Sequence, residues 1–544
     1  MTQPDLRVVV LVADDSTAHE GAAVLAGAGA QVTVLRPSAT RESSRGLVDG
    51  ALVVRVPMRE PQAGDARKAA MIEFKADSGH GQLGRVEALV RRVWLRLLKS
   101  GVPERLASSE GQDLELTFGG LIDRLQPDVV HAQGVQTLAV ATRAAGRAKA
   151  QKRPLRVVYQ GTTDKVQKKY LGRADVVIQP GADVLAAYGR SPVPARSRTH
   201  ERRLLIGPVN SAGQAWLWAT ALEREVPGLA AEALNTAGAT YQFAAHRTAT
   251  SEQYKTDLRW QYDLMAWALA EVTHVLFEAG RPMFGQLPGQ MWTSDVPALD
   301  KAGIRHGLVF HGSEIRDPAR HRELFEHSPF QNADDDFTKR LQAANDVLRR
   351  HLATYEGPVF VTTPDLLEFV DNGTWLPLTV DVDAFASDRP VLERERPVVL
   401  HAPSSGALKG SAYVDPVLTE LEARGLIEYR RVEGVRHAEL AALVQDADIV
   451  VDQLVLGSYG VLACESMAAG RVTVGHVAER VRALLPAELP IAEATPADLR
   501  QVIERLISER ETARKLADGG VAYVRELHDG RRAVEALLPF LGGR

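Results

Sequence analysis

The sequence of 544 residues contains one cysteine, few aromatic residues (6%) and no excess of basic charge. Cys464 has no second cysteine to pair with, so an internal disulfide is excluded, and a lone thiol is typical of a reducing compartment. The 65 Lys and Arg residues are balanced by 69 Asp and Glu residues, whereas proteins that bind nucleic acid usually present a basic surface. The sequence shows no signal-peptide pattern and no apolar run of the length that spans a membrane. We therefore expect a cytoplasmic protein without a nucleic-acid partner.

Short apolar runs alternate with helical patterns along the whole chain. The first runs, Arg7–Val12 and Gln31–Leu35, flank a helix predicted at Glu20–Ala28. This alternation is typical of α/β folds with parallel sheets, and the chain is too long for a single hydrophobic core. Two proline-containing, charged stretches, 189–203 and 386–396, interrupt the pattern as linkers do. We predict three Rossmann-like α/β domains, at residues 1–190, 204–388 and 389–544.

The first two predicted domains share a series of similar segments. In each pair an apolar run is followed by small or polar residues: PDVVHAQG (127–134) with VTHVLFEAG (272–280), RVVYQGTTD (156–164) with HGLVFHGSEIRD (306–317), and ADVVIQPGADVL (174–185) with GPVFVTTPDLLEF (357–369). We interpret these pairs as a diverged internal duplication. Because only one C-terminal domain follows the two copies, the first copy is expected to be an accessory module: an acceptor-binding unit, a dimerisation surface or a remnant. The alternative is that it shares the single C-terminal domain.

The richest stretch for chemistry runs from Pro403 to His476. Lys409 follows the apolar run 398–400, and a turn containing Ser458, Tyr459 and Gly460 leads into a helix of small residues that begins near Val461 and carries Glu465. A diphosphate needs a cation and free backbone N–H groups, which the first turn of a helix supplies. We expect Lys409 and the N–H groups of Gly460 and Val461 to bind a diphosphate, and Glu465 to accept hydrogen bonds from a ribose.

These residues carry a resemblance to a known family. The runs HAPSS…LKG and RRVEGVRHAEL…ADIVVDQLVLGSYGVLACESMAAGRVTV resemble the C-terminal domain of retaining GT-B glycosyltransferases of the family 4 type. The resemblance implies two Rossmann-like domains around a cleft, here with one additional N-terminal domain, and a last helix that crosses back to the preceding domain. Glu465 matches the family's ribose-binding glutamate and Lys409 its diphosphate-binding lysine. Gly457 stands where the family has the first glutamate of its E-x7-E motif, and Ser404 stands near the place of an arginine.

The resemblance also assigns a loop to the nucleotide base. This loop runs from Glu433 to His437 and is expected to contact the base through backbone groups. No metal is expected, because the resembling fold usually needs no divalent ion. The D-x-D sequence at 381–383 falls at a domain end before a linker, where we do not expect a metal site.

Two loops of the middle domain are further candidates, the first for the donor side, with Gly213 as a donor-binding residue, and the second for the acceptor side. The Gly207–Gly213 turn follows a strand, and Gly213 is its candidate ligand-facing residue; a plain strand-to-helix turn is the alternative. His311 lies just past a strand end with Gly312, Ser313 and Glu314, and open α/β sheets bind ligands there. His311 is the candidate catalytic acid or base; a histidine hydrogen-bonded within its own loop is the alternative.

A basic amphipathic helix is predicted at Gly84–Lys99. It is suited either to an anionic membrane surface or, as we prefer, to packing on the first sheet. Peripheral membrane contact at the inner face and a homo-oligomer are both compatible with the sequence.

Taken together, these features predict a glycosyltransferase that moves a sugar from a nucleotide-diphosphate donor to a hydroxyl of a glycan, lipid-linked or small-molecule acceptor. The resemblance implies that stereochemistry is retained. No cofactor besides the donor is expected. One alternative is a non-catalytic nucleotide-binding scaffold, because Gly457 replaces a glutamate. The other is a sugar-nucleotide epimerase, which the lack of clear acid and base carboxylates disfavours.

Overall fold

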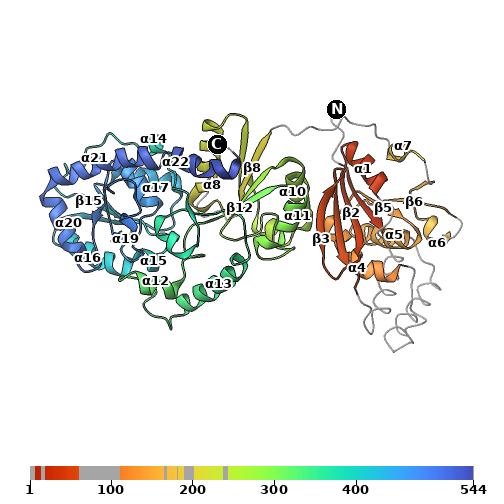
Figure 1. Ribbon diagram of the computed structural model, residues 1–544, viewed down its shortest axis with the longest axis horizontal. Helices are drawn as coiled ribbons and strands as arrows, with labels where there is room; N and C mark the ends of the chain where they lie inside the picture. The colour runs from red at the N-terminus through yellow and green to blue at the C-terminus, as the bar shows by residue number, and fades with distance from the viewer. Residues whose placement is uncertain are drawn as a thin grey trace. The chain divides into compact units, whose positions relative to one another are not determined.

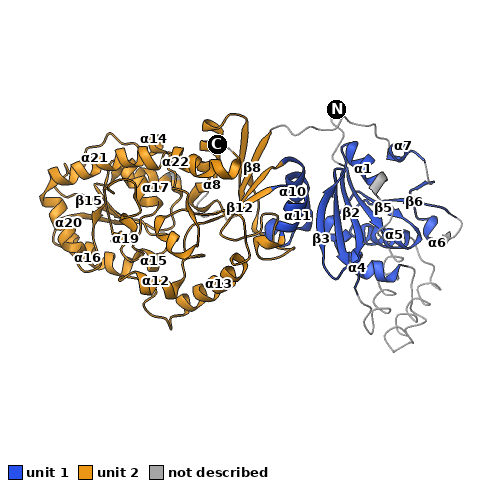
Figure 2. Ribbon diagram, viewed as in Figure 1, with its two compact units in different colours: residues 1–199, 252–271, 295–304 blue, residues 200–251, 272–294, 305–544 orange. Residues whose placement is uncertain are grey.

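The computed structural model describes residues 6–13, 19–59, 111–163, 168–179, 182–188, 201–236 and 243–542. The basic helix predicted at 84–99 and most of the linker predicted at 189–203 lie outside these residues. The chain forms two compact units (Figure 2), unit 1 with residues 1–199, 252–271 and 295–304, and unit 2 with residues 200–251, 272–294 and 305–544. Within the described ranges, no helix has both the length and the apolar character needed to cross a membrane.

Unit 1 is built on a seven-stranded sheet with the order β3-β4-β2-β1-β5-β6-β7. Five consecutive residues of its central strand are buried, as expected for a strand covered on both faces. All neighbours pair in parallel except β3, which returns antiparallel to β4 as an edge hairpin that the sequence did not predict. The strands are β1 (Arg7–Val12), β2 (Gln31–Ser38), β3 (Ser44–Val48), β4 (Ala51–Pro57), β5 (Val129–Gln133), β6 (Arg156–Gln160) and β7 (Val176–Ile178).

The helices of unit 1 include two that come from the middle of the sequence (Figure 2). They are α1 (His19–Gly27), α4 (Gln112–Leu125), α5 (Val135–Ala150), α6 (Lys168–Leu171), α7 (Val184–Tyr188), α10 (Leu258–Glu271) and α11 (Val296–Lys301). The short α9 (Ser251–Thr256) begins at the boundary between the units.

The first lobe of unit 2, here called the middle lobe, has an all-parallel sheet of seven strands with the order β10-β9-β8-β11-β12-β13-β14. Its first strand in the sequence, β8, lies between β9 and β11, as β1 lies between β2 and β5 in unit 1. The segments that resemble one another in sequence form β5 and β11, β6 and β12, and β7 and β13. The strands are β8 (Arg202–Gly207), β9 (Leu229–Asn235), β10 (Arg247–Thr248), β11 (His274–Glu278), β12 (Arg305–Phe310), β13 (Val359–Val361) and β14 (Thr374–Trp375).

The helical segments of the middle lobe include three short 3₁₀ turns. They are η2 (Ser211–Gly213), α8 (Gln214–Glu225), η3 (Trp292–Ser294), α12 (Pro318–Leu324), α13 (Asp336–Leu352), η4 (Pro364–Phe369) and α14 (Val382–Phe385).

The second lobe of unit 2, here called the C-terminal lobe, has a parallel sheet of five strands with the order β16-β15-β17-β18-β19. The predicted α/β class with parallel-sheet domains is therefore confirmed. The elements are β15 (Val398–His401), α15 (Gly406–Lys409), α16 (Ser411–Ala423), β16 (Glu428–Arg431), α17 (His437–Asp446), β17 (Ile449–Val451), α18 (Val461–Ala468), β18 (Val472–Gly475), α19 (Glu479–Arg482), β19 (Ala492–Glu493), α20 (Leu499–Ser508), α21 (Arg510–Leu527) and α22 (Arg531–Leu541).

The last helix, α22, leaves the C-terminal lobe and packs beside α8 of the middle lobe (Figure 1). Leu537 and Phe540 belong to the buried core of the middle lobe, where the Phe540 ring meets Phe360 of β13 edge-on. Gly530 precedes the helix, and a Cβ atom there would lie only 2.7 Å from the Ala221 side chain of α8. The crossing of the last helix that the resemblance implied is thus confirmed, and it joins the two lobes.

Because α22 completes the middle core, shortening one of its buried side chains should destabilise the protein. We expect Leu537→Ala to lower the free energy of unfolding by about 2–5 kcal/mol, since it removes buried methyl groups and leaves a cavity. Glu535→Ala, an exposed change on the same helix, should shift it by less than about 0.5 kcal/mol. Urea unfolding followed by circular dichroism measures both, and equal effects would contradict the proposed packing.

Candidate functional site

A cleft of about 260 Å³ lies between the two lobes of unit 2. The middle lobe contributes Ala212 and Phe243 to its wall, and the C-terminal lobe contributes the rest. Apolar side chains form much of the surface: Pro403, Val432, Val435, Leu440, Val461 and Leu462. Among the residues predicted to bind a ligand, six line this cleft together: Ser404, Lys409, Glu433, His437, Val461 and Glu465.

Lys409 ends the short helix α15 and reaches the carboxyl end of the next strand in the sheet. Its Nζ donates hydrogen bonds to Asp452 Oδ1 at 2.7 Å and to Gln453 Oε1 at 2.9 Å. Asp452 is buried, and its Oδ2 accepts the N–H of Gly460 at 3.0 Å. The N–H predicted to meet a phosphate is therefore held by Asp452, which also balances the charge of Lys409.

The turn before α18 is shaped by this ion pair. A Cβ atom at Gly460 would lie 3.1 Å from Lys409 Nζ, so the glycine leaves room for the ammonium group. Val461 is the first residue of α18, and first-turn N–H groups have no acceptor within their own helix. The positive end of the helix and the ammonium group thus lie on one side of the cleft, where they favour an anion.

Glu465 lies in the second turn of α18 with a side chain that is only 4% exposed. Its Oε1 is 2.6 Å from Nε2 of His437, the first residue of α17. Burial raises the pKa of the Glu465 carboxyl, and His437 opposes this rise. The hydrogen bond to Glu465 in turn raises the pKa of His437. Both side chains line the cleft, and the Phe243 ring lies 5.1 Å from the His437 ring.

Ser458 and Tyr459 of the predicted turn are buried inside the C-terminal lobe rather than lining the cleft. The Tyr459 hydroxyl lies 3.3 Å from that of Tyr523 and 3.2 Å from His528 Nε2. The Ser458 carbonyl accepts a hydrogen bond from Gln453 Nε2. Both residues therefore anchor the turn that presents Gly460 and α18.

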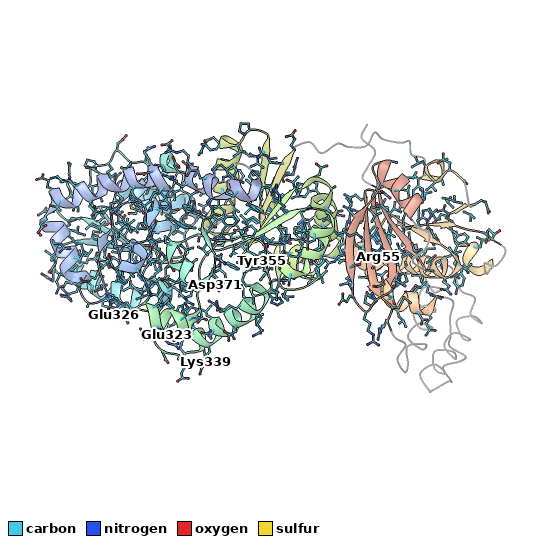
Figure 3. The ribbon with its side chains drawn as sticks, viewed as in Figure 1. Arg55, Glu323, Glu326, Lys339, Tyr355 and Asp371 are labelled. Carbon is cyan, nitrogen blue, oxygen red and sulfur yellow. The ribbon has the colours of Figure 1, made fainter. Side chains whose placement is uncertain are left out.

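Gly457 faces the middle lobe instead of the cleft. Its φ is +67°, and a Cβ atom there would lie 2.5 Å from the ring of Phe325. Phe325 follows α12 and is buried, whereas its neighbours Glu323 and Glu326 point outward (Figure 3). The position that the resemblance assigns to the first glutamate is thus occupied by an aromatic contact between the lobes.

The predicted acceptor-side residues lie at the carboxyl end of β12, and none of them lines this cleft. His311 stacks on Trp218 at 5.9 Å, and its Nε2 lies 3.0 Å from Glu278 Oε1. Glu314 accepts the backbone N–H of His311, and the Gly312 carbonyl accepts N–H groups later in the same loop. Gly213 immediately precedes α8 with a φ of +75°, and the Phe243 ring would lie 3.1 Å from a Cβ atom there.

Four residues that shape the site were not predicted from the sequence. Asp452 and Gln453 follow β17, and Glu278 ends β11, so each carries the usual signal of a polar side chain at the carboxyl end of a strand. Phe243 carries no such signal, because its role depends on a contact between lobes.

Polar side chains at strand ends of unit 1 form hydrogen bonds with one another. His131 is fully buried, with Nδ1 at 2.9 Å from the Tyr188 hydroxyl and Nε2 at 3.0 Å from Gln160 Oε1. Burial lowers the pKa of His131 to about 4. These side chains satisfy one another.

The D-x-D aspartates have other contacts. Asp381 caps α14 through the N–H of Ala384, and Asp383 pairs with Arg525 at 3.2 Å. The described residues contain no group of three or more His, Cys, Asp or Glu side chains placed to hold a metal ion.

The Phe325 contact can be tested at Gly457 with a matched glycine. Gly425→Ala has the same kind of positive φ but no atom within 4 Å, so it should cost about 1–2 kcal/mol of unfolding free energy from backbone strain alone. We expect Gly457→Ala to cost about 1–3 kcal/mol more, because it overpacks the contact.

A double-mutant cycle with Phe325→Ala, measured by urea unfolding, tests this cause. When Phe325→Ala is already present, Gly457→Ala should lose much less unfolding free energy, because the ring that it overpacks is gone. Equal costs for the two glycine variants would contradict the contact.

The Glu465–His437 pair predicts a pH effect. Because the pKa of His437 is raised in the folded chain, the stabilisation by this pair is complete below about pH 6.5 and is lost as the pH rises through the folded pKa. We expect Glu465→Gln to lower the pKa of His437 toward its usual value, as measured by NMR titration of the ring protons. Glu439→Gln changes an exposed side chain of α17, the helix that begins with His437, and should leave the pKa of His437 unchanged. A raised pKa that survives in Glu465→Gln would refute the pairing.

Comparison with known proteins gives structural likeness only. No protein-family model and no curated protein matches the sequence. HepE from Anabaena, solved with UDP-glucose, is 12% identical over 63% of this chain and 99% of HepE, with a TM-score of 0.41. A glycosyltransferase from Rickettsia africae is 12% identical over 63% of this chain and 98% of its own, with a TM-score of 0.41. Sucrose-phosphate synthase from Thermosynechococcus elongatus is 10% identical over 97% and 96%, with a TM-score of 0.26. At these identities and scores the likeness transfers no ligand or activity to this chain.

Proposed function

We propose that the cleft binds a nucleotide-diphosphate sugar and that the chain is a glycosyltransferase that passes the sugar to a hydroxyl acceptor. The observation that carries this proposal is that a cation, Lys409, and a buried acid, Glu465, line one cleft together with the start of α18. These are the groups that the two ends of a ribose diphosphate require.

The diphosphate is assigned to the end of the cleft near Lys409. There the ammonium group and the first-turn N–H groups of α18 would meet the phosphate oxygens. Asp452 now holds Lys409 and the Gly460 N–H, so a bound diphosphate would share or replace these bonds. The same groups would stabilise the charge of the departing diphosphate, which is the main electrostatic demand of the transfer.

The nucleoside is assigned to the other end. Glu465 has accepting oxygens for two ribose hydroxyls, and a ribose would take the place of the His437 hydrogen bond. The base would lie between the apolar wall of Val432 and Val435 and the ring of Phe243. The cleft volume is slightly below the range of about 300–1,000 Å³ typical of ligand sites, which suits the nucleotide half of the donor, with the sugar extending toward the middle lobe.

The molecule that accepts the sugar would bind to the middle lobe, where His311 and Glu314 lie at the carboxyl end of β12. His311 is the group we assign to contact the acceptor hydroxyl. We further propose a family 4 type of reaction with retention of stereochemistry and no metal. Glycans, lipid-linked glycans and small molecules remain the acceptor classes, at the inner face of the membrane if the acceptor is lipid-linked.

A second candidate function is a nucleotide-binding scaffold without transfer activity. It is favoured by Gly457, which stands where the resembling family has a glutamate, and by the Phe325 ring, which leaves no room for a longer side chain at that position. A sugar-nucleotide epimerase is the third hypothesis.

Incubation of the protein with a panel of sugar nucleotides separates the three hypotheses. Release of nucleoside diphosphate only in the presence of cell-envelope extract supports the glycosyltransferase. Formation of an epimerised sugar nucleotide without an acceptor supports the epimerase. Saturable binding without release or epimerisation supports the scaffold.

Donor binding tests the assignment directly. Because hydrogen bonds to charged groups contribute about 1.5–3 kcal/mol, we expect Lys409→Gln and Glu465→Gln each to raise the Kd for a nucleoside diphosphate by about 10- to 150-fold. Isothermal titration calorimetry measures the change, with Lys339→Gln, an exposed lysine of α13, as the control. Unchanged affinity in both site variants, with the fold intact by circular dichroism, would remove the assignment.

A further inference from the structure

Glu278, the last residue of β11, is fully buried at the edge of the middle-lobe sheet where ligands usually bind. Its Oε2 accepts the N–H groups of Val209 at 2.9 Å and Asn210 at 2.7 Å. Its Oε1 accepts the N–H of Ser211 at 3.3 Å and lies 3.0 Å from His311 Nε2. One carboxylate thus ties the loop after β8 to the loop after β12.

Burying a carboxylate is unfavourable unless its oxygens are fully hydrogen-bonded. At Glu278 three of the partners are backbone N–H groups, which only donate, so the carboxylate oxygens must accept. An ionised carboxylate also cannot donate to His311, and the hydrogen of this contact therefore belongs to His311 Nε2. The network fixes which ring nitrogen of His311 carries the proton.

The other ring nitrogen of His311 is left available. Within the described part of the chain, no group forms a hydrogen bond with His311 Nδ1. This atom is also not one of the buried polar side-chain atoms that lack a partner, so solvent reaches it. The ring plane is fixed by stacking on Trp218 of α8, at an interplanar angle of 7°. Nδ1 is therefore the atom of His311 that a ligand can reach.

We propose that Glu278 is a positioning residue that holds the 209–211 loop and His311 in one arrangement and commits His311 to the Nε2–H form, with Nδ1 presented to the acceptor hydroxyl. The role toward an acceptor rests on the proposed transferase function. The network and the tautomer stand without it. Nδ1 can accept the hydroxyl proton as the acceptor oxygen bonds to the anomeric carbon of the sugar, while the bond from that carbon to the diphosphate breaks and the nucleoside diphosphate leaves with the bonding electrons. The ring is then doubly protonated beside the carboxylate.

The charges around His311 agree with this role. Burial lowers the pKa of His311, but the hydrogen bond and charge of Glu278, together with the charge of Glu314, raise it above its ordinary value. Arg316, on the same loop, is held by the buried Asp365 at 2.6 Å. Trp218, which packs on the ring from α8, carries no charge.

The first test is NMR of the ¹⁵N-labelled full chain, with the His311 ring signals assigned by His311→Asn. We expect the Nε2–H tautomer above the pKa and a raised pKa in the unaltered protein. In Glu278→Gln the side-chain amide keeps an oxygen for the loop but presents an N–H to His311, so the tautomer should switch to Nδ1–H and the pKa should fall. Glu314→Gln is the matched control, because it removes a nearby charge without contacting the ring, and should retain the tautomer.

An Nδ1–H tautomer in the unaltered protein would overturn the proposal even if Glu278→Gln failed to fold. An unchanged tautomer in a folded Glu278→Gln would also overturn it. Hydrogen exchange at Val209 and Asn210, whose N–H groups bind Oε2, reports on the loop. We expect it to remain slow in Glu278→Gln, where the amide oxygen still accepts both N–H groups, and to quicken in Glu278→Ala.

Turnover gives the second readout. If sugar transfer is found, Glu278→Gln should lower kcat at least about 10-fold and shift the acid limb of its pH profile, with the KM for the donor unchanged. A fall caused by donor binding alone would overturn the acceptor role. If no sugar nucleotide binds, the proposed function fails, whereas the NMR results still decide the role of Glu278.

Discussion

The ion pair between Lys409 and Asp452 is the interaction on which the cleft of unit 2 depends. It joins the short helix α15, which follows β15, to the loop after β17, and through the Gly460 N–H it sets where α18 begins. The pair lies in a partly buried place, where each charge needs the other. A site organised in this way keeps its shape without a ligand, and an incoming anion exchanges bonds with groups that are already in position.

The strands of the fold could be predicted where apolar runs were short and continuous, as in β1, β11 and β15. β9 was missed because its sequence, LAAEALN, has the composition of a helix and becomes a strand only by pairing beside β8. β3 was missed because it is an edge strand with a glycine and one buried residue. Neighbouring strands in the sheet, rather than local propensity, decide such segments.

The candidate site shows the same division. Lys409 and Glu465 could be named as candidates because their residue types and spacing carry the chemistry. His437 was expected only as part of the loop that the resemblance assigns to the base, through backbone groups, whereas its side chain meets Glu465. The roles of Asp452 and Glu278 depend on the hydrogen bonds that bring loops of different strands together, which no single stretch of sequence records. Gly457 was noted as a departure from a family pattern, and the Phe325 ring gives the physical reason, since the two lobes touch at that point.

The return of α22 to the middle lobe affects how the protein can be divided for study. Helix α22 follows the C-terminal lobe in sequence but packs in the hydrophobic core of the middle lobe, so neither lobe is complete as a separate fragment. A piece that stops before Arg531 would leave the apolar surface of α8 exposed to water, and a piece that starts at the C-terminal lobe would carry an unpaired apolar helix. The natural unit for expression and crystallisation is therefore the pair of lobes together.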